Sequence, residues 1–355
     1  MHRPEGKLAD ITGPGLTDQF GVNCTDLGAS LTAPDGSLVS VFGDTFSGDA
    51  VGQGDWRSPV ILIGSGDAAH PITYRRAGGP DPEFAQQLWR YAHRPGRPRR
   101  GISTVIPSDL LRVGDTLYLH AIVNRGFGNV VWTEIWRSDD SGVSWRRLNA
   151  TFPAGLHQGH AQCWTWDYNP DDGWIYVAST GFQRDKGIVL QRVRPAHLAD
   201  RRKYSGWGRR KGLWSWGARP TPVTPAGETW GELSLRRLDN GKWILGGFLS
   251  SEYALGYRVM NSPNDVRSAP LQRPVIGSAW DDEDHAGGRV AQLYGGYVLP
   301  HSRLNVVGGV GLVVSQWNTD HGWPYRAMQF RATLHDTTHT RQPKRESPSS
   351  GVPLI

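Results

Sequence analysis

The chain repeats one pattern of apolar and polar positions five times. Each copy has an apolar run, a tight turn, and a second apolar run that ends in small residues. The copies are Thr25–Phe46, Ser108–Asn124, Gln162–Gly181, Glu232–Ser250 and Gln292–Gln316. Alternation with a period of two buries one face of a strand, and the Asp-Gly or Asn-Gly pairs in several turns favour hairpins because both central residues need positive φ. The pattern therefore predicts five β-hairpins.

The spacing of these hairpins predicts the fold. They recur every ~60–80 residues, as a repeat with long loop insertions would, and further strands are expected at Trp132–Arg137 and Ile188–Arg194. Five sheets of about four strands indicate an all-β, five-bladed β-propeller; a β-sandwich with long insertions is the alternative. We expect an N-terminal extension at residues 1–15, the propeller at 16–334 and a disordered polar tail at 335–355.

One further motif favours a propeller. Ser138–Trp145 reads SDDSGVSW, which fits the Asp-box turn S-x-D-x-G-x-[ST]-W found in sialidases and other propellers. We expect its Asp and Ser side chains to cap backbone amides of the turn and its Trp to pack beneath. The motif supports the fold and says little about chemistry.

Composition excludes several classes of protein. The net charge of +6 comes largely from Arg94–Arg100, Arg201–Lys203 and Arg209–Lys211, which we interpret as solvated loops because no nucleic-acid-binding motif accompanies them. No stretch approaches the ~20 apolar residues of a membrane span. The two cysteines, Cys24 and Cys163, form no disulfide framework, and we expect two unpaired buried thiols. We predict a monomer that neither binds nucleic acid nor inserts in membranes.

The first 15 residues contain no apolar segment typical of a secretion signal. We therefore expect the protein to act inside the cell or to leave it by another route, unless a leader has been removed.

Acidic residues stand where the inner strand begins in three of the five predicted hairpins. The first strands of propeller blades line the central channel, so the residues that start them share one end of it. The aligned set is Asp26, Asp109, Gln162, Glu232 and Gln292. Hydrolysis of a glycosidic bond needs a proton donor and a second carboxylate, and a third carboxylate raises the pKa of the acid. We assign Asp26 as base or nucleophile, Glu232 as general acid and Asp109 as the tuning group.

A second Asp competes for one of these roles. Asp44 ends the second strand of the first hairpin, so it should lie close to Asp26 and is an alternative to Asp109. Strand-start caps that bond to loop amides are the non-catalytic interpretation of all these acids.

Polar and aromatic residues near the same strand ends are candidates for contact with substrate. Aromatic rings pack on the C–H faces of sugars, and the chain has 16 Trp. The candidates are Asp55, Trp56, His93, Asn124, His160, Gln162, Trp164, Trp230 and Gln292.

One acidic cluster raises the question of a metal. His285 follows four acidic residues, Asp281–Asp284, and such oxygens can hold a cation. A solvated acidic loop is the favoured interpretation. We predict no metal and no cofactor.

Several long segments resemble a known family. They are TDLG at Thr25–Gly28, VFGDTFSGD at Val41–Asp49, GDWRSPV at Gly54–Val60, GISTVIPSDLL at Gly101–Leu111, WGELSLRRL at Trp230–Leu238 and VAQLYGGYVLP at Val290–Pro300. They resemble domain of unknown function 4185, now grouped with the endo-D-arabinanases of glycoside hydrolase family 183, over roughly residues 16–334. The resemblance implies cleavage of α-linked D-arabinofuranose chains in mycobacterial arabinogalactan and lipoarabinomannan. Asp26, Asp44, Asp109 and Glu232 lie inside the matching motifs.

Two other functions compete with this hydrolase. A non-catalytic glycan-binding propeller of a phage or cell-wall protein is one, although uncompensated acids add little to a pure binding site. A sialidase-like enzyme is the other, and it would need clustered arginines. Arg57, Arg125, Arg184 and Arg289 are available, but no spacing groups them. By analogy with other five-bladed furanosidases, we expect inversion at the anomeric carbon.

Overall fold

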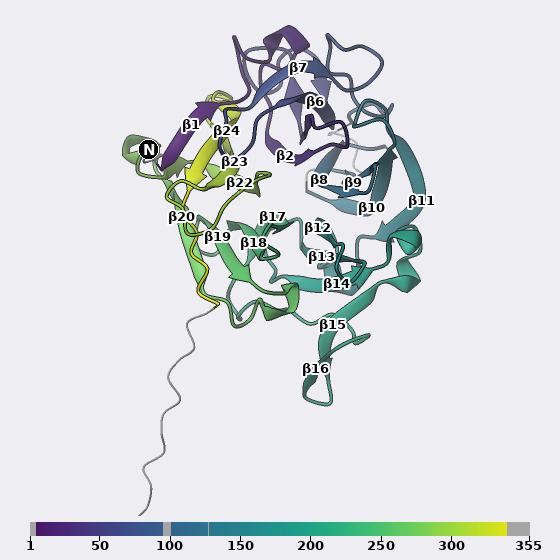
Figure 1. The fold of residues 1–355 in the computed structure, drawn as a ribbon. Helices are drawn as coiled ribbons and strands as arrows, with labels where there is room; N and C mark the ends of the chain where they lie inside the picture. Colours follow the sequence, from purple (N-terminus) through teal and green to yellow (C-terminus); the bar gives the residue numbers. More distant parts are fainter. Residues whose placement is uncertain (1–4, 95–100, 127, 339–355) are drawn as a thin grey trace, which may run out of the picture.

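The computed structural model describes residues 5–94, 101–126 and 128–338. Five small sheets surround a central axis and form a five-bladed β-propeller (Figure 1). The repeated hairpin pattern therefore predicted the fold correctly, and the sandwich alternative is excluded.

Each blade runs from an inner strand at the axis to an outer strand at the rim. The first blade contains β2 (Leu27–Thr32), β3 (Leu38–Phe42), β6 (Val60–Ser65) and β7 (Thr73–Ala77). The second contains β8 (Thr104–Val113), β9 (Thr116–Asn124), β10 (Val130–Ser138) and β11 (Arg146–Pro153). The third contains β12 (Cys163–Asn169), β13 (Trp174–Thr180), β14 (Val189–Val193), β15 (Ser205–Arg210) and β16 (Leu213–Trp216).

The last two blades complete the circle. The fourth contains β17 (Trp230–Arg237), β18 (Trp243–Leu249), β19 (Ala254–Met260), β20 (Leu271–Ser278) and β21 (Arg289–Ala291). The fifth contains β22 (Leu293–Val298), β23 (Val310–Trp317), β24 (Tyr325–Ala332) and β1 (Gly6–Asp10). A separate ribbon joins β4 (Thr45–Phe46) to β5 (Trp56–Arg57).

In the described part of the chain, helical structure is confined to single turns. The 3₁₀ segments are η1 (Asp18–Phe20), η2 (Leu156–Gly159), η3 (Pro195–His197), η4 (Arg201–Lys203), η5 (Pro263–Asp265) and η6 (Trp280–Asp282). No helix among the described residues has the length and apolar character needed to cross a membrane.

The N-terminal strand closes the ring. β1 is the outermost strand of the fifth blade and pairs antiparallel with β24, so the two ends of the chain share one sheet. The expected boundary at residue 16 therefore lies too late, because Gly6–Asp10 belongs to a blade. At the other end, His335 N donates to Gln272 Oε1 (2.8 Å) and Lys242 pairs with Asp336 (2.9 Å). The rest of the expected tail, residues 339–355, lies outside the described residues.

The predicted hairpins match the observed ones except at the start of the second. Its inner strand, β8, begins at Thr104 and not near Asp109, and the register shifts between Pro107 and Asp109. The strand continues through Pro107. An inner strand is an edge strand, and an edge position tolerates proline because no ladder hydrogen bond is lost there.

The Asp-box turn has the expected structure. Asp140 Oδ1 accepts a hydrogen bond from Ser144 N (2.9 Å), and Ser138 Oγ accepts one from Gly142 N (3.0 Å). Trp145 packs against the core and donates to Gly142 O (2.9 Å). These bonds fix the turn between β10 and β11.

The apolar core fills the space between the blades. Trp164, Trp166, Trp230 and Trp243 are among its largest fully buried side chains. Cys24 and Cys163 are buried and unpaired, as expected. Burial raises the pKa of the Cys24 thiol to about 11 and that of the Cys163 thiol to about 12, so both are protonated at neutral pH.

Side chains join the inner strands to one another. Successive inner strands are in contact around the axis, but none pairs with the next by a backbone ladder. Each junction instead has a side chain that bonds to the neighbouring backbone, because buried edge groups need partners. The bonds between inner strands are Ser108 Oγ to Trp164 O (2.7 Å), Leu235 N to Thr165 Oγ1 (2.6 Å), Val298 N to Ser234 Oγ (2.9 Å) and, exposed to solvent, Arg112 Nη1 to Thr32 O (3.3 Å). Where the fifth blade meets the first, Leu27 N donates to Ser315 Oγ (2.9 Å) of the second strand, β23.

A buried ion pair lies at the centre of this ring. Arg236 of β17 donates to both oxygens of Asp109 of β8, at 2.8 and 2.6 Å. Asp109 is fully buried and also accepts a hydrogen bond from Thr165 Oγ1 of β12 (2.7 Å). The pair therefore joins three blades, and loss of either partner would leave the other charge buried without compensation.

We expect Arg236→Met to lower the free energy of unfolding by about 3 kcal/mol, because Asp109 would stay buried without its cation. Urea denaturation measures the loss. The double variant Asp109→Asn/Arg236→Met, which removes both charges, should be more stable than Arg236→Met alone.

The adjacent Arg237 provides the control. It pairs with Asp171, whose side chain is 73% exposed, so Arg237→Met should cost less than about 1 kcal/mol. Equal losses in the two single variants would contradict a special role for the buried pair.

Candidate active site

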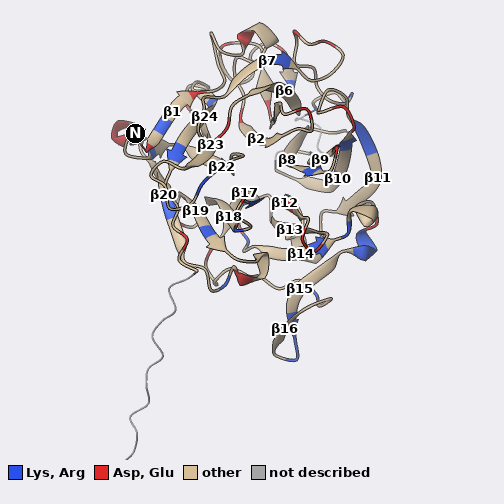
Figure 2. Ribbon diagram, viewed as in Figure 1, with Lys and Arg blue, Asp and Glu red and all other residues tan. Residues whose placement is uncertain are grey.

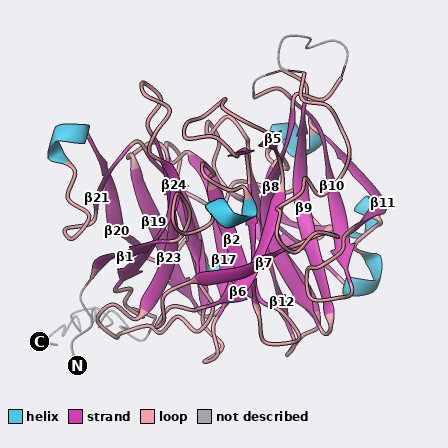
Figure 3. Cartoon of the chain, turned by 90° about the horizontal axis from the view of Figure 1, so that it is seen from above, coloured by secondary structure: helices cyan, strands magenta, loops and turns pink. Residues whose placement is uncertain are grey.

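Three acidic side chains meet at the end of the axis where the inner strands begin. Asp26 directly precedes β2, Asp44 follows β3, and Glu232 is the third residue of β17. The charges of both Asp44 and Glu232 act on Asp26. The nearby ribbon strand β5 marks this end of the propeller in the side view (Figure 3).

Asp26 lies at the centre of this group. Its Oδ2 accepts a hydrogen bond from Tyr294 Oη (3.1 Å). A side chain at position 43 would collide with Asp26 Oδ1, so Gly43 leaves space for the carboxyl group. Burial, followed by the charge of Asp44, raises the pKa of Asp26 to about 8, although the hydroxyls of Tyr325 and Tyr294 act in the opposite direction. Asp26 is therefore protonated at neutral pH.

Asp44 is held by the first two blades. Its Oδ1 accepts hydrogen bonds from Trp56 Nε1 (2.8 Å) and from Thr104 Oγ1 (2.7 Å) at the start of β8. Burial raises the pKa of Asp44, and the bonds from Thr104 and Trp56 oppose that shift. The Trp56 ring stacks on His93, with ring centroids 3.9 Å apart. Burial lowers the pKa of His93 to about 4, so this ring is neutral.

Glu232 forms an ion pair across two blades. Arg184, in the loop between β13 and β14, donates to Glu232 Oε1 at 2.6 Å. The guanidinium also lies over the rings of Phe248 and Tyr294, at 5.1 and 5.3 Å. The register of β17 against β18 shifts between Trp230 and Leu233, and such a bulge redirects a side chain. The local irregularity thus turns Glu232 toward Arg184 and Asp26.

Two carboxylate oxygens in this group have no partner. Asp26 Oδ1 and Glu232 Oε2 are buried and accept no hydrogen bond from the described residues. Buried polar atoms are normally satisfied, and exceptions concentrate where a ligand or reaction supplies the partner. In this pair, the protonated Asp26 can donate a proton, and the ion-paired Glu232 can accept one.

Asp109 does not belong to this group. Its expected place at the start of an inner strand is wrong, because β8 begins five residues earlier and Thr104 occupies that place. Both Asp109 oxygens bind Arg236 in the interior. Because both oxygens of Asp109 already accept hydrogen bonds from Arg236, this carboxylate has a structural role.

Only some of the predicted contact residues lie beside the acids. Trp56 and His93 flank Asp44, and Asp55 is exposed next to Trp56. Trp164 and Trp230 are fully buried in the core, which removes them from the set that can touch a sugar.

Three of the four remaining predicted contacts are engaged with loops of the protein. Gln162 bridges Ala154 O and Phe182 N, and Gln292 bonds to Thr319 through both ends of its amide. His160 Nδ1 contacts His157 O at 2.9 Å. Asn124 is buried at the end of β9, and its Oδ1 has no hydrogen-bond partner among the described residues.

Sequence reasoning missed four residues of the site. They are Thr104, Arg184, Tyr294 and Tyr325. Tyr294 lies two positions after Gln292, so the period of two along an inner strand could have indicated it. Arg184 lies in a loop with positive φ (60°), and no pattern in the sequence connects it to Glu232.

Three of the four arginines considered for a sialidase have separate partners, and the fourth, Arg125, has a buried Nε without a hydrogen-bond partner among the described residues. Arg57 donates to Ala85 O (2.7 Å), Arg184 pairs with Glu232, and Arg289 lies 4.0 Å from Asp284. They form no cluster for a substrate carboxylate.

The acidic loop at residues 281–285 is bonded to its own surroundings. Glu283 Oε2 accepts from Ala291 N (3.0 Å), and Glu283 lies 3.2 Å from His285 Nε2. Within the described ranges, no group of three or more His, Cys, Asp or Glu has the arrangement of a metal site.

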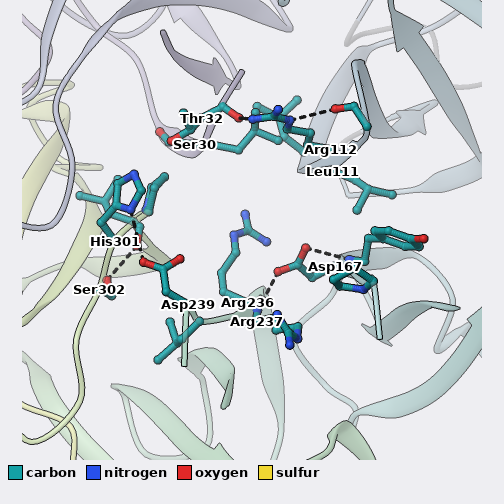
Figure 4. Close-up of a pocket in the computed structure, with 18 residues that line it drawn as sticks. Ser30, Thr32, Leu111, Arg112, Asp167, Arg236, Arg237, Asp239, His301 and Ser302 are labelled. Carbon is teal, nitrogen blue, oxygen red and sulfur yellow. Dashed lines mark hydrogen bonds and ion pairs between the residues drawn. The ribbon is translucent and has the colours of Figure 1, made fainter. Parts of the chain in front are cut away.

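A cavity of about 570 Å³ opens at the opposite end of the axis. It is lined where the inner strands end, by residues that include Thr32, Arg112, Asp167, Arg237 and His301 (Figure 4). Arg236 also lines it, so the buried Asp109–Arg236 pair lies at its inner limit. Asp26, Asp44 and Glu232 do not line this cavity.

Known proteins share the fold across most of the chain. A putative hydrolase from Bacteroides ovatus ATCC 8483 is 13% identical with a TM-score of 0.58, and the match covers 88% of this chain and 86% of that one. A GH43_1 enzyme from Xanthomonas citri is 14% identical with a TM-score of 0.51, covering 93% and 92%. At this identity the likeness establishes the fold alone.

Sequence relatives also match nearly end to end. An uncharacterized 35.9 kDa protein of Mycolicibacterium smegmatis is 28% identical over 346 residues, covering 91% of this chain and 97% of the relative. Notoamide biosynthesis cluster protein J' of Aspergillus versicolor is 27% identical over 321 residues, covering 85% and 83%. The family model for domain of unknown function 4185 matches residues 12–331. The chain therefore belongs to the DUF4185 family.

Proposed function

We propose that this protein is a glycoside hydrolase and that Asp26, Asp44 and Glu232 form its active site. The observation that carries the proposal is the convergence of a protonated Asp26 with the ion-paired Glu232, each with one buried oxygen that has no partner. Acid-catalysed glycoside cleavage needs this combination of one neutral and one charged carboxyl group. Among structures with the same fold are proteins described as a putative hydrolase and as a β-xylosidase.

The electrostatics favour a different division of roles from the one expected from sequence. Asp26, with a pKa of about 8, suits the proton donor, and Glu232, ion-paired with Arg184, suits the base or nucleophile. Asp44 would raise the pKa of Asp26 by its charge and hold Trp56 in place. Asp109 has no role in the proposed reaction.

We propose D-arabinan as the substrate, cut within the chain at α-D-arabinofuranosyl linkages. The motif resemblance to endo-D-arabinanases supports this choice, and the Mycolicibacterium smegmatis relative is consistent with a mycobacterial substrate. Trp56, His93 and Asp55 are the proposed sugar contacts beside the acids. Inversion at the anomeric carbon stays a prediction, which NMR of the first-formed product anomer would test.

Incubation with purified mycobacterial arabinogalactan should release a ladder of arabino-oligosaccharides. We expect Asp26→Asn and Glu232→Gln each to lower kcat by about 10²–10⁴-fold, because each removes a proton-transfer group. Chromatography of the products measures the rate, and circular dichroism checks folding.

Asp115→Asn is the matched control, since Asp115 is exposed in the β8–β9 turn at the opposite end of the axis. It should be fully active. Binding of arabinogalactan without any product, by folded wild-type protein, would instead favour a glycan-binding propeller. Full activity in both acid variants would contradict the assignment of the site.

The alkaline limb of the pH profile of kcat/KM should report the pKa of Asp26. Activity should fall as pH rises through about 8, because the proton donor is lost there. Asp44→Asn should move this limb to lower pH, since the charge of Asp44 raises the Asp26 pKa. Burial is the larger cause, so the limb should stay well above the range of an ordinary Asp. An unshifted limb in Asp44→Asn would show that Asp44 does not tune Asp26.

Stability provides a test of the same pKa that is independent of activity. The folded protein holds the Asp26 proton to a higher pH than the unfolded chain does, so the contribution of Asp26 to stability is lost as pH rises toward about 8. In Asp26→Asn the side chain at position 26 does not titrate, so this loss of stability with rising pH is absent. Relative to wild type, the variant should therefore gain stability between pH 4 and pH 9 in thermal denaturation.

A further inference from the structure

The hairpin β15–β16 projects outward from the rim of the third blade (Figure 1). Its strands pair from Trp207–Trp216 to Arg210–Leu213, and Lys211 and Gly212 form a two-residue turn with φ of 51° and 84°. The turn is therefore tight, and the last pair of residues lies directly behind it.

This part of the chain carries an excess of positive charge. Residues 192–219 contain nine Lys or Arg and one acidic residue, so their net charge of +8 exceeds the +6 of the entire protein. Arg201–Lys203, Arg209–Lys211 and Arg219 are all exposed. In Figure 2, Lys and Arg positions colour parts of the β15–β16 hairpin blue. Among the described residues of the stretch, only Arg202 has an acidic side-chain partner, Asp200. We call the exposed cations of residues 201–219 together with the hairpin the basic arm.

The tip of the basic arm is also apolar. Leu213 is 75% exposed, the highest value among the exposed large hydrophobic side chains of the described residues. Trp207, Trp214 and Trp216 lie behind it and are half-buried. A single exposed leucine is ordinary on a protein surface. Here it stands beside three cations, Arg209–Lys211, at the end of a projecting hairpin.

The three tryptophan rings already pack against one another and against arginines, which favours one kind of partner over others. Trp207 packs on Trp214 and Trp216, Arg267 and Arg209 lie over Trp214, and Arg192 lies over Trp216. Stacking on sugars or bases needs an open ring face. A bilayer needs none, because it attracts cations to its headgroups and accepts aliphatic and Trp side chains at the interface.

We propose that the basic arm binds the surface of an anionic phospholipid bilayer, with Leu213 entering the headgroup layer and Arg209–Lys211 contacting phosphate and carboxylate groups. The attachment is peripheral and lies at the rim of the third blade. It does not depend on the proposed hydrolase activity.

The test is co-sedimentation of the full-length protein with vesicles of phosphatidylcholine and phosphatidylserine at 3:1. Vesicles of phosphatidylcholine alone should bind at least roughly tenfold less protein, and high salt should weaken binding to the anionic vesicles. Arg209→Gln/Arg210→Gln/Lys211→Gln should lower the partition coefficient about 100-fold and flatten its dependence on salt. Leu213→Gln should lower it up to about tenfold with the salt dependence unchanged.

The control removes the same charge elsewhere. Arg75, Arg90 and Arg303 are exposed and lie outside the third and fourth blades, so the triple Gln variant at these positions should bind within about twofold of wild type. Equal losses in the two triple variants would mean that only net charge matters and would overturn the proposal. Binding to dextran sulfate or duplex DNA through the basic arm, without binding to anionic vesicles, would also overturn it.

Discussion

The inner edges of the five blades impose the constraint on which this structure depends. Each inner strand has one edge without a ladder partner, yet it lies in the interior, where unpaired backbone groups are costly. Ser108, Thr165, Ser234 and Ser315 supply buried partners across four of the junctions, and Arg112 bonds to Thr32 O at the exposed fifth. The ring is thus closed by side chains, and β1 completes it at the rim by pairing with β24.

The same ring explains why one acidic residue is structural and others are available for chemistry. Asp109 lies in the middle of an inner strand, where it can join three blades only by pairing with Arg236. Asp26 directly precedes its inner strand, and Glu232 lies at a register shift near the start of its own. There each carboxyl group keeps one oxygen without a partner. Position along the strand, and not charge or burial alone, separates the two kinds of acid.

The third blade differs from the others in what it exposes. Its β15–β16 hairpin leaves the rim with an excess of cations and an apolar tip, while a cavity of about 570 Å³ opens at the end of the axis away from the proposed active site. The proposed reaction site, this cavity and the charged arm are therefore located on three separate parts of the molecule. A rigid propeller permits this separation because its loops vary without disturbing the inner ring.

Local patterns in the sequence were enough to predict the five hairpins, the propeller and the candidates Asp26, Asp44 and Glu232, because a period of two and Asp-Gly or Asn-Gly turns are local properties. The remaining features depend on contacts in the folded chain. The alignment misplaced Asp109 because β8 begins at Thr104 and continues through Pro107, which an edge strand accepts. The partners of the acids, Arg184 and Tyr294, come from other blades. Contacts between segments so far apart depend on blade geometry, for which no local pattern in the sequence exists.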